Sequence, residues 1–90
     1  MFLTIVKLPV NSTKRREIML TLKELARRMR CEENCLQAVI CHDPKNADIL
    51  YFLEDWRPES SHDESEFKAV LHGMGSLLAE PLEITELVTL

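Results

Sequence analysis

The residues of this sequence that are best suited to chemistry flank a predicted corner between Trp56 and His62. Histidine changes its charge near neutral pH, so His62 is the strongest candidate for a general base. Trp56 is the only tryptophan, and its large ring could form the wall of a pocket for an aromatic ligand. Both residues have a structural alternative, because Trp56 could simply fill the corner and His62 could bond to the backbone at a helix start.

Other candidates for a ligand site lie on either side of this corner. Neighbours in a strand point to opposite faces, so one of Tyr51 and Phe52 would face the helices and the other the far side of the sheet. Glu54 and Asp55 could accept a hydrogen bond from a ligand hydroxyl, although a solvated strand edge explains such residues more often. The candidate substrate-binding residues are Trp56, Phe52, Tyr51, Phe67, Leu71 and His72, and for His72 a surface position is favoured.

The cysteines do not have the spacing of a metal site. Cys31, Cys35 and Cys41 are an odd number without a secretory context, so reduced thiols are expected. A zinc site is disfavoured, because Cys35 and Cys41 would share one face of a strand while His42 points to the other. A regulatory disulfide between Cys31 and Cys35 is an alternative, but buried inert thiols are favoured. We expect no metal and no other cofactor.

Charge and hydropathy exclude several classes of partner. The net charge is −4, and no aromatic residues interleave with the basic ones, so we expect a solvated helix face and no nucleic acid. No run of about 18 apolar residues is present, and the first residues resemble a strand more than a signal peptide. We therefore expect a cytoplasmic protein with no membrane partner. Seven of the eleven basic residues fall on one predicted helix: Lys14, Arg15, Arg16, Lys23, Arg27, Arg28 and Arg30.

The first half of the chain predicts a strand, a helix and a hairpin. Phe2–Val10 has apolar residues at both odd and even positions, as in a strand that is covered on both faces. A helix capped by Asn11, Ser12 or Thr13 follows and runs to about Arg30, with apolar residues at helical spacing. Cys35–Cys41 and Ala47–Trp56 are predicted strands, joined by a loop of about five residues.

The second half predicts one more helix and one more strand. Ser61 and Glu64 form a possible capping box, and apolar residues at helical spacing continue to Leu78, before Pro81. Gly73 and Gly75 lie inside this pattern, either for close packing against the sheet or to leave room for a ligand. Leu82–Leu90 is the last predicted strand.

The order β-α-β-β-α-β over residues 1–90 predicts one α+β domain with a ferredoxin-like fold. Its four-stranded antiparallel sheet carries both helices on one face. The other face would then be a large apolar patch, and a homodimer through sheet faces would cover it. Lys7, on an otherwise apolar strand, lies either at a pocket mouth or, as we favour, in an ion pair across the dimer with an acid such as Glu86.

Several short motifs resemble the antibiotic biosynthesis monooxygenase (ABM) family. They are Tyr-Phe-Leu-Glu-Asp-Trp at 51–56, the His62, Ser65 and Phe67 spacing, and Leu-Leu-Ala-Glu-Pro at 77–81. Asn34-Cys35-Leu36 stands where relatives usually carry Gly-Cys. The resemblance implies a dimeric α+β barrel with a pocket between helices and sheet. It also implies oxygenation of quinols or anthrones without metal or flavin, in which the substrate anion supplies the electron to oxygen.

The sequence departs from the family pattern at several positions. Trp56 and His62 are six residues apart, where relatives have a longer insert, and Phe52 lies where active monooxygenases often carry a polar residue such as Asn. A haem-degrading branch uses an Asn on the first strand and a His after Phe-Lys-Ala. Here Lys7 and Leu71 stand near those positions, with His72 one residue beyond, so haem breakdown is disfavoured. The alternative to a monooxygenase acting on a small aromatic or quinol-like substrate is a non-catalytic dimeric module that binds a small apolar molecule.

Overall fold

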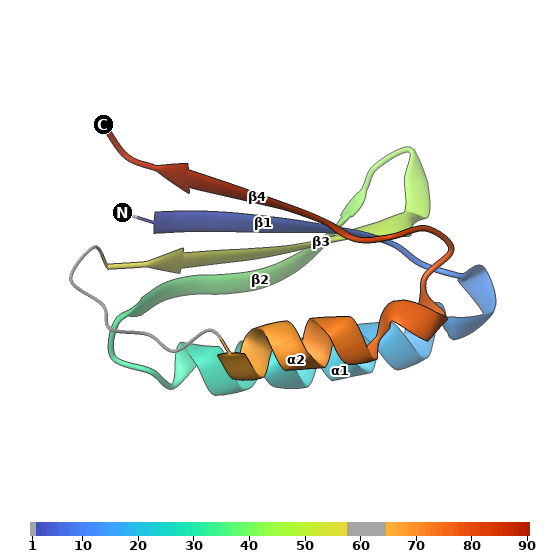
Figure 1. Cartoon of the computed structure of the whole chain (residues 1–90), viewed down its shortest axis with the longest axis horizontal. Helices are drawn as coiled ribbons and strands as arrows, with labels where there is room; N and C mark the ends of the chain where they lie inside the picture. The colour runs from blue at the N-terminus through green and yellow to red at the C-terminus, as the bar shows by residue number, and fades with distance from the viewer. Residues whose placement is uncertain (1, 58–64) are drawn as a thin grey trace.

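The computed structural model describes the backbone of residues 2–57 and 65–90 and the side chains of residues 3–57 and 69–90. Its strands are β1 (Phe2–Pro9), β2 (Cys35–Asp43), β3 (Asn46–Trp56) and β4 (Glu83–Val88). They form one sheet in the order β2-β3-β1-β4, and every neighbouring pair is antiparallel (Figure 1). The predicted ferredoxin-like α+β fold is confirmed.

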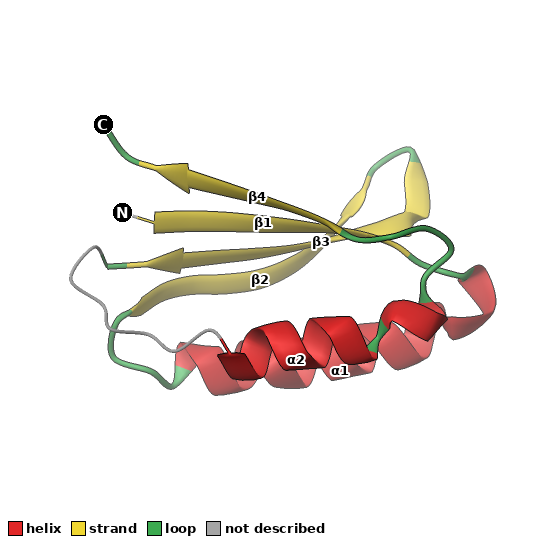
Figure 2. Cartoon of the chain, viewed as in Figure 1, coloured by secondary structure: helices red, strands yellow, loops and turns green. Residues whose placement is uncertain are grey.

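Both helices lie against the same face of this sheet. Helix α1 (Arg15–Arg30) connects β1 to β2, and helix α2 (Ser65–Gly73) lies between β3 and β4 in the chain. Figure 2 shows the two helices as one layer and the four strands as the other. Within the part of the chain that is described, no helix has the length and apolar character needed to cross a membrane.

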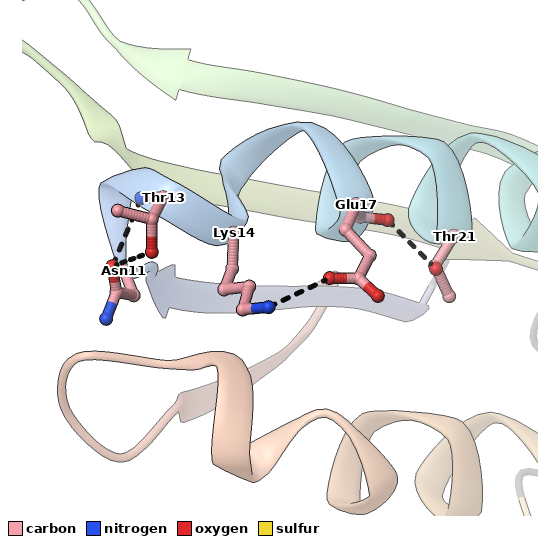
Figure 3. A network of polar contacts seen from close by, with 5 residues as sticks. All are labelled: Asn11, Thr13, Lys14, Glu17 and Thr21. Atoms are coloured by element: carbon pink, nitrogen blue, oxygen red, sulfur yellow. Dashed lines mark hydrogen bonds and ion pairs between the residues drawn. The ribbon is translucent and has the colours of Figure 1, made fainter.

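The start of α1 is fixed by local polar contacts (Figure 3). Asn11 Oδ1 accepts hydrogen bonds from the Thr13 backbone N–H at 3.1 Å and from the Thr13 hydroxyl at 2.8 Å. These contacts cap a short 3₁₀ turn, η1 (Ser12–Lys14), that leads into the helix. Lys14 then forms an ion pair with Glu17 at 3.9 Å, and the Thr21 hydroxyl donates to the Glu17 carbonyl at 3.0 Å.

The hairpin between β2 and β3 is tighter than predicted. Only Pro44 and Lys45 lie between the strands, where the sequence predicted a loop of about five residues. The Lys45 N–H donates to Asp43 Oδ1 at 2.7 Å, so the side chain stabilises the turn in place of further loop residues. The strands therefore begin and end closer to the turn than their apolar pattern indicated.

The second helix is shorter than predicted. It ends at Gly73, and the chain continues through a 3₁₀ turn, η2 (Gly75–Leu77), instead of a helix to Leu78. Glycine in a helix interior costs about 1 kcal/mol relative to alanine, which explains the break. A Cβ at either glycine would meet no described atom within 4 Å, and neither glycine has positive φ. Close packing against the sheet is therefore wrong as the reason for these glycines.

The last strand is also shorter than the predicted Leu82–Leu90. It spans Glu83–Val88, and all six of its residues are exposed. It is the outermost strand beside β1, and in Figure 1 it lies along the edge of the sheet farthest from the helices.

The apolar core lies between the helices and the sheet. Alternate residues of β1 and β3 point into it, and α1 and α2 contribute the opposing side chains. The face of the sheet that points away from the helices, called the far face, presents the alternate residues of the same strands. Its apolar residues are half-buried; they are Leu3, Ile5, Val39, Tyr51 and Leu53. The predicted apolar character of both faces is thus confirmed for the central strands. The core side chains are Val6, Leu8, Ile18, Leu22, Leu50, Phe52, Leu71 and Met74, among others.

Candidate functional site

Polar residues lie inside the core near the Trp56 end of the sheet. Thr4 of β1 and Glu54 of β3 are register partners and share the helix face, and they are only 3% and 1% exposed. On the other side of Glu54, the β2 partner is the fully buried Ala38. A carboxyl group in the middle of a sheet and under helices is unusual, because burial of a charge is costly unless it has partners.

The indole of Trp56 is one partner of this carboxyl group. Residues two apart on a strand share a face, so Trp56 lies beside Glu54. The Trp56 indole N–H donates to Glu54 Oε1 at 3.1 Å, and this bond is buried. A hydrogen bond is directional, so this one fixes the orientation of the ring.

Thr4 supplies a further polar atom on the same face. Its hydroxyl oxygen is buried and has no hydrogen-bond partner among the residues that the structure describes. Side chains directly opposite on neighbouring strands have Cβ atoms about 5 Å apart, so the Thr4 hydroxyl and the Glu54 carboxyl are neighbours. Buried polar atoms normally have a hydrogen-bond partner, so the Thr4 hydroxyl is the atom of this cluster that is available to a further group.

Cys35 closes this end of the cluster on β2. It is the register partner of Trp56, and it is half-buried. Burial raises the pKa of the Cys35 thiol; a backbone hydrogen bond with Gln37 acts in the opposite direction, and the negative charges of Glu54 and Glu32 raise it further. The thiol is therefore protonated at neutral pH and a poor nucleophile.

The other two cysteines differ from their predicted positions. A β-bulge between Cys35 and Gln37 shifts the register, so Cys41 pairs with Tyr51 on the far face while Cys35 pairs with Trp56 on the helix face. The prediction that Cys35 and Cys41 share one face is wrong for this reason. Cys31 and Cys41 are exposed free thiols, and not buried ones as predicted.

Three of the predicted ligand-binding residues come together on the helix side. Phe52 is fully buried, Leu71 is 1% exposed and Trp56 is 4% exposed, and all three belong to one apolar cluster. Tyr51 points to the opposite face, so it cannot line the same site as Phe52 within one chain. His72 lies exposed on α2.

Several predicted residues lie wholly or in part outside the described part of the chain. His62, the candidate base, and the Ser61 and Glu64 capping box are among the residues that are not described. Phe67 lies in α2, but its side chain is also outside the described set. Their roles remain predictions.

Lys7 forms an ion pair within the chain. Its ammonium lies 3.9 Å from Glu83 Oε2 of the same chain, and the two residues are register partners on the far face. Glu86 pairs in register with Thr4 and so points to the helix face. Within one chain, Lys7 and Glu86 thus lie on opposite faces of the sheet, and the favoured ion pair across a dimer stays a prediction.

Several basic side chains of α1 are used within the chain. Arg15 Nε donates to the Ala47 carbonyl at 2.7 Å, and Arg30 Nη1 donates to the Ala38 carbonyl at 2.7 Å. Arg27 forms a hydrogen-bonded ion pair with Glu24, which lowers the pKa of the Glu24 carboxyl. These contacts give the basic residues a structural role.

Two open grooves border α1, away from Trp56. One, of about 610 Å³, lies between α1 and β2, with Leu20, Arg27 and Ile40 among its lining residues. The other, of about 370 Å³, lies between α1 and Val70 of α2. Neither includes Phe52, Trp56 or Glu54, so neither coincides with the predicted site.

Sequence reasoning underestimated the burial of Glu54 and Asp55. Glu54 and Asp55 were expected at a solvated edge, yet Asp55 is also buried at 9% exposure. The signal was the strand parity: Glu54 lies between Phe52 and Trp56 on their face, and Thr4 shares its parity with Val6 and Leu8. A polar residue whose neighbours on the same strand face are apolar was the signal of burial.

Comparisons with known proteins agree with this fold. The chain matches the family model described as antibiotic biosynthesis monooxygenase over residues 1–69. No curated protein matches it.

Among solved structures, a conserved protein from Methanosarcina mazei Go1 is 27% identical, with a TM-score of 0.83 over 96% of this chain and 89% of that one. A protein from Deinococcus radiodurans, whose name assigns it provisionally to the antibiotic biosynthesis monooxygenases, is 17% identical, with a TM-score of 0.85 over 99% and 92%. A protein from Mycobacterium tuberculosis is 17% identical, with a TM-score of 0.82 over 99% and 94%.

The likeness to the last two proteins shows the fold, and the family model shows the family, because it covers more than half of the sequence. The chain therefore belongs to the antibiotic biosynthesis monooxygenase family.

Proposed function

We propose that this protein is a cofactor-independent monooxygenase that acts on a small aromatic or quinol-like substrate. The observation that carries the proposal is the Trp56 indole, held by a buried hydrogen bond to Glu54 within the apolar cluster that contains Phe52 and Leu71. Aromatic and apolar side chains with a polar group among them are the composition typical of a site for a flat, mostly apolar ligand with a polar group at one end. Membership of the family supports the same chemistry.

The reaction needs only the substrate and oxygen. Removal of a proton gives a substrate anion, which donates an electron to O₂; one oxygen atom then joins the carbon skeleton and the other leaves as water. For an anthrone the products are an anthraquinone and water, so no external reductant is required. The tasks of the protein are to bind the ring, to accept the proton, which we assign to His62, and to exclude water.

We further propose that the protein acts as a homodimer through its far sheet face. The apolar residues on that face include Leu3, Ile5, Tyr51 and Leu53 at its centre and the exposed Leu87 of β4. An apolar face of this kind, on a chain of only 90 residues, favours a symmetric partner.

A non-catalytic binding module is the second candidate. Its support is Phe52, which stands where a polar residue is frequent in active relatives and which is fully buried in the core. In that case the same fold would bind a small apolar molecule without turnover.

Oxygen uptake with a panel of quinols and anthrones tests the enzyme. We expect wild-type protein to consume oxygen above the buffer rate, and His62→Ala to be slower by about 10²-fold or more, since a general base contributes about that much. Trp56→Phe, which keeps an aromatic ring, should retain part of the rate. His42→Ala is the matched control, because this histidine is exposed on β2 and is not one of the candidate site residues. Uptake equal to that of buffer for all substrates would favour the binding module.

A further inference from the structure

Strand β2 forms one edge of the sheet, and among the described strands only β3 pairs with it. The Ala38 carbonyl accepts a hydrogen bond from Arg30 Nη1 at 2.7 Å, so this carbonyl points away from β3. Backbone groups of an antiparallel strand alternate between its two sides, so Ile40, two residues further on, also directs its N–H and C=O outward. An edge strand of this kind is a template on which a further extended chain can pair.

The larger of the two grooves runs beside this edge. Val39, on the far face, and Ile40, on the helix face, both line it, so the groove extends around the edge of the sheet. On the α1 side, Leu20 contributes an apolar side chain that is 56% exposed. Sites for small molecules enclose most of the ligand surface, whereas this groove is open. Its shape and position therefore suit an extended chain that lies along β2.

The α1 side of this groove is mostly basic. Lys23, Arg27 and Arg30 line it, together with one acid, Glu24. Arg27 is paired with Glu24, and Arg30 holds the Ala38 carbonyl, whereas Lys23 forms no hydrogen bond or ion pair with another described residue. Positive charge thus exceeds negative charge here, although the protein as a whole has a net charge of −4. Complementarity of charge favours an acidic partner.

The same charges disfavour a second copy of this chain as the partner of the β2 edge. Symmetric pairing of β2 with β2 of another copy would place the two α1 helices side by side on one face of a continuous sheet. Their basic side chains would then face each other, and like charges in contact oppose association. Lysine and other charged residues at a sheet edge are a common means of preventing such self-pairing. An acidic strand would satisfy the backbone groups and the charges together.

We propose that the β2 edge and the adjoining face of α1 bind an extended acidic peptide of a partner protein by strand addition. This surface lies outside the Trp56 cluster, so its role is independent of the proposed monooxygenase activity. Side chains of an added strand alternate between the two faces of the sheet. Those beside Ile40 would face Lys23 and Arg27 and should be acidic. Those beside Val39 would lie on the far face and should be apolar or β-branched.

The test uses a fluorescein-labelled peptide with the alternating sequence Glu-Val-Glu-Thr-Glu-Val, whose affinity is measured by fluorescence polarisation at low salt. Two further peptides carry N-methyl groups on alternate residues, one on the first, third and fifth and the other on the second, fourth and sixth. An added strand bonds to β2 through the N–H groups of one side only. We therefore expect one methylated peptide to bind about tenfold or more weakly, since each lost hydrogen bond costs a few-fold, and the other to retain the affinity.

Variants of the protein test the charge and the position. Lys23→Glu should weaken binding by about threefold to tenfold, because it replaces an attraction by a repulsion. Lys45→Glu is the matched control: it makes the same change of charge in the turn after β2, outside the groove, and should leave the affinity within about twofold. In ¹H–¹⁵N NMR spectra, the Ile40 N–H should exchange more slowly with solvent when the peptide is bound. The same spectra report whether each variant is folded.

Three results would overturn the proposal. They are no saturable binding of the alternating acidic peptide, binding that neither set of N-methyl groups weakens, and an affinity that Lys45→Glu lowers as much as Lys23→Glu. The comparison of the methylated peptides needs only the wild-type protein, so it decides even if a variant fails to fold. Protection of the Ile40 N–H without peptide that disappears on dilution would also overturn the proposal, because a second copy would then occupy the edge.

Discussion

At the scale of single residues, the energetics centre on one buried carboxyl group. Water stabilises a charge far better than an apolar core does, so Glu54 requires compensating contacts. The Trp56 N–H supplies one at 3.1 Å, and removal of either member would leave the other short of a partner. Loss of this hydrogen bond should therefore lower the free energy of unfolding.

A testable prediction at this scale concerns the Cys35 thiol. Because burial raises its pKa, the thiolate of the folded protein forms only at higher pH than in the unfolded chain. Alkylation of Cys35 by iodoacetamide should therefore be slower in native protein, with its pH profile shifted to more alkaline values. Peptide mass spectrometry after timed alkylation measures this rate, with protein in urea as the control.

The same shift has a consequence for stability. A folded chain that holds this proton more tightly than the unfolded chain is favoured below the thiol's ordinary pKa, and it loses that advantage as the pH rises above it. Cys35→Ser should flatten this alkaline decline. An alkylation profile that is the same in native and urea-treated protein would contradict the burial of this thiol.

At the scale of elements, the end of α2 offers the clearest test. Gly73 ends the helix with ordinary backbone angles, is exposed, and has open space where a Cβ would lie. Gly73→Ala should therefore raise the free energy of unfolding by about 0.5–1 kcal/mol, since alanine loses less backbone freedom on folding. Urea denaturation followed by circular dichroism measures it.

Gly75→Ala is the matched comparison for this element. It has equal space for a Cβ but lies in a three-residue 3₁₀ turn, so its effect should be smaller. A loss of stability in Gly73→Ala of 1 kcal/mol or more would mean that a contact of this glycine, such as one with a partner chain, depends on the missing side chain.

At the scale of the whole molecule, the proposal of a dimer through the far face of the sheet can be tested by substitution. A lysine in the centre of this face would be buried without a counter-charge in a face-to-face dimer, which is strongly unfavourable. Leu53→Lys should therefore convert the dimer to a monomer, as measured by sedimentation equilibrium or native mass spectrometry. Leu53 lies on β3, a central strand, and is half-buried in the single chain.

Leu20→Lys is the control for this substitution. Leu20 is 56% exposed on α1, on the opposite side of the molecule from the far face. The Leu20→Lys substitution should therefore leave the oligomeric state unchanged. A monomeric wild-type protein, or a Leu53→Lys variant that still dimerises, would show that the far face is not the dimer interface.

The sequence by itself determined the order of the elements and the parity of their side chains. Strand and helix periods are local properties, so the alternation of Phe2–Pro9 and the stripe Ile18, Leu22, Leu25 and Met29 could be predicted before any contact was known. Only the tertiary structure decided which set of alternate strand residues faces the helices. That choice placed Phe52 inside and Tyr51 outside, and it buried Glu54 and Thr4 together.

The remaining differences have the same physical origin. The bulge after Cys35 and the two-residue hairpin turn depend on pairing between strands, which no single run of residues specifies. The end of α2 at Gly73 reflects a balance between helix propensity and packing that a periodic apolar pattern does not contain. Periodicity can be read from the sequence, whereas burial depends on which elements cover each face of the sheet.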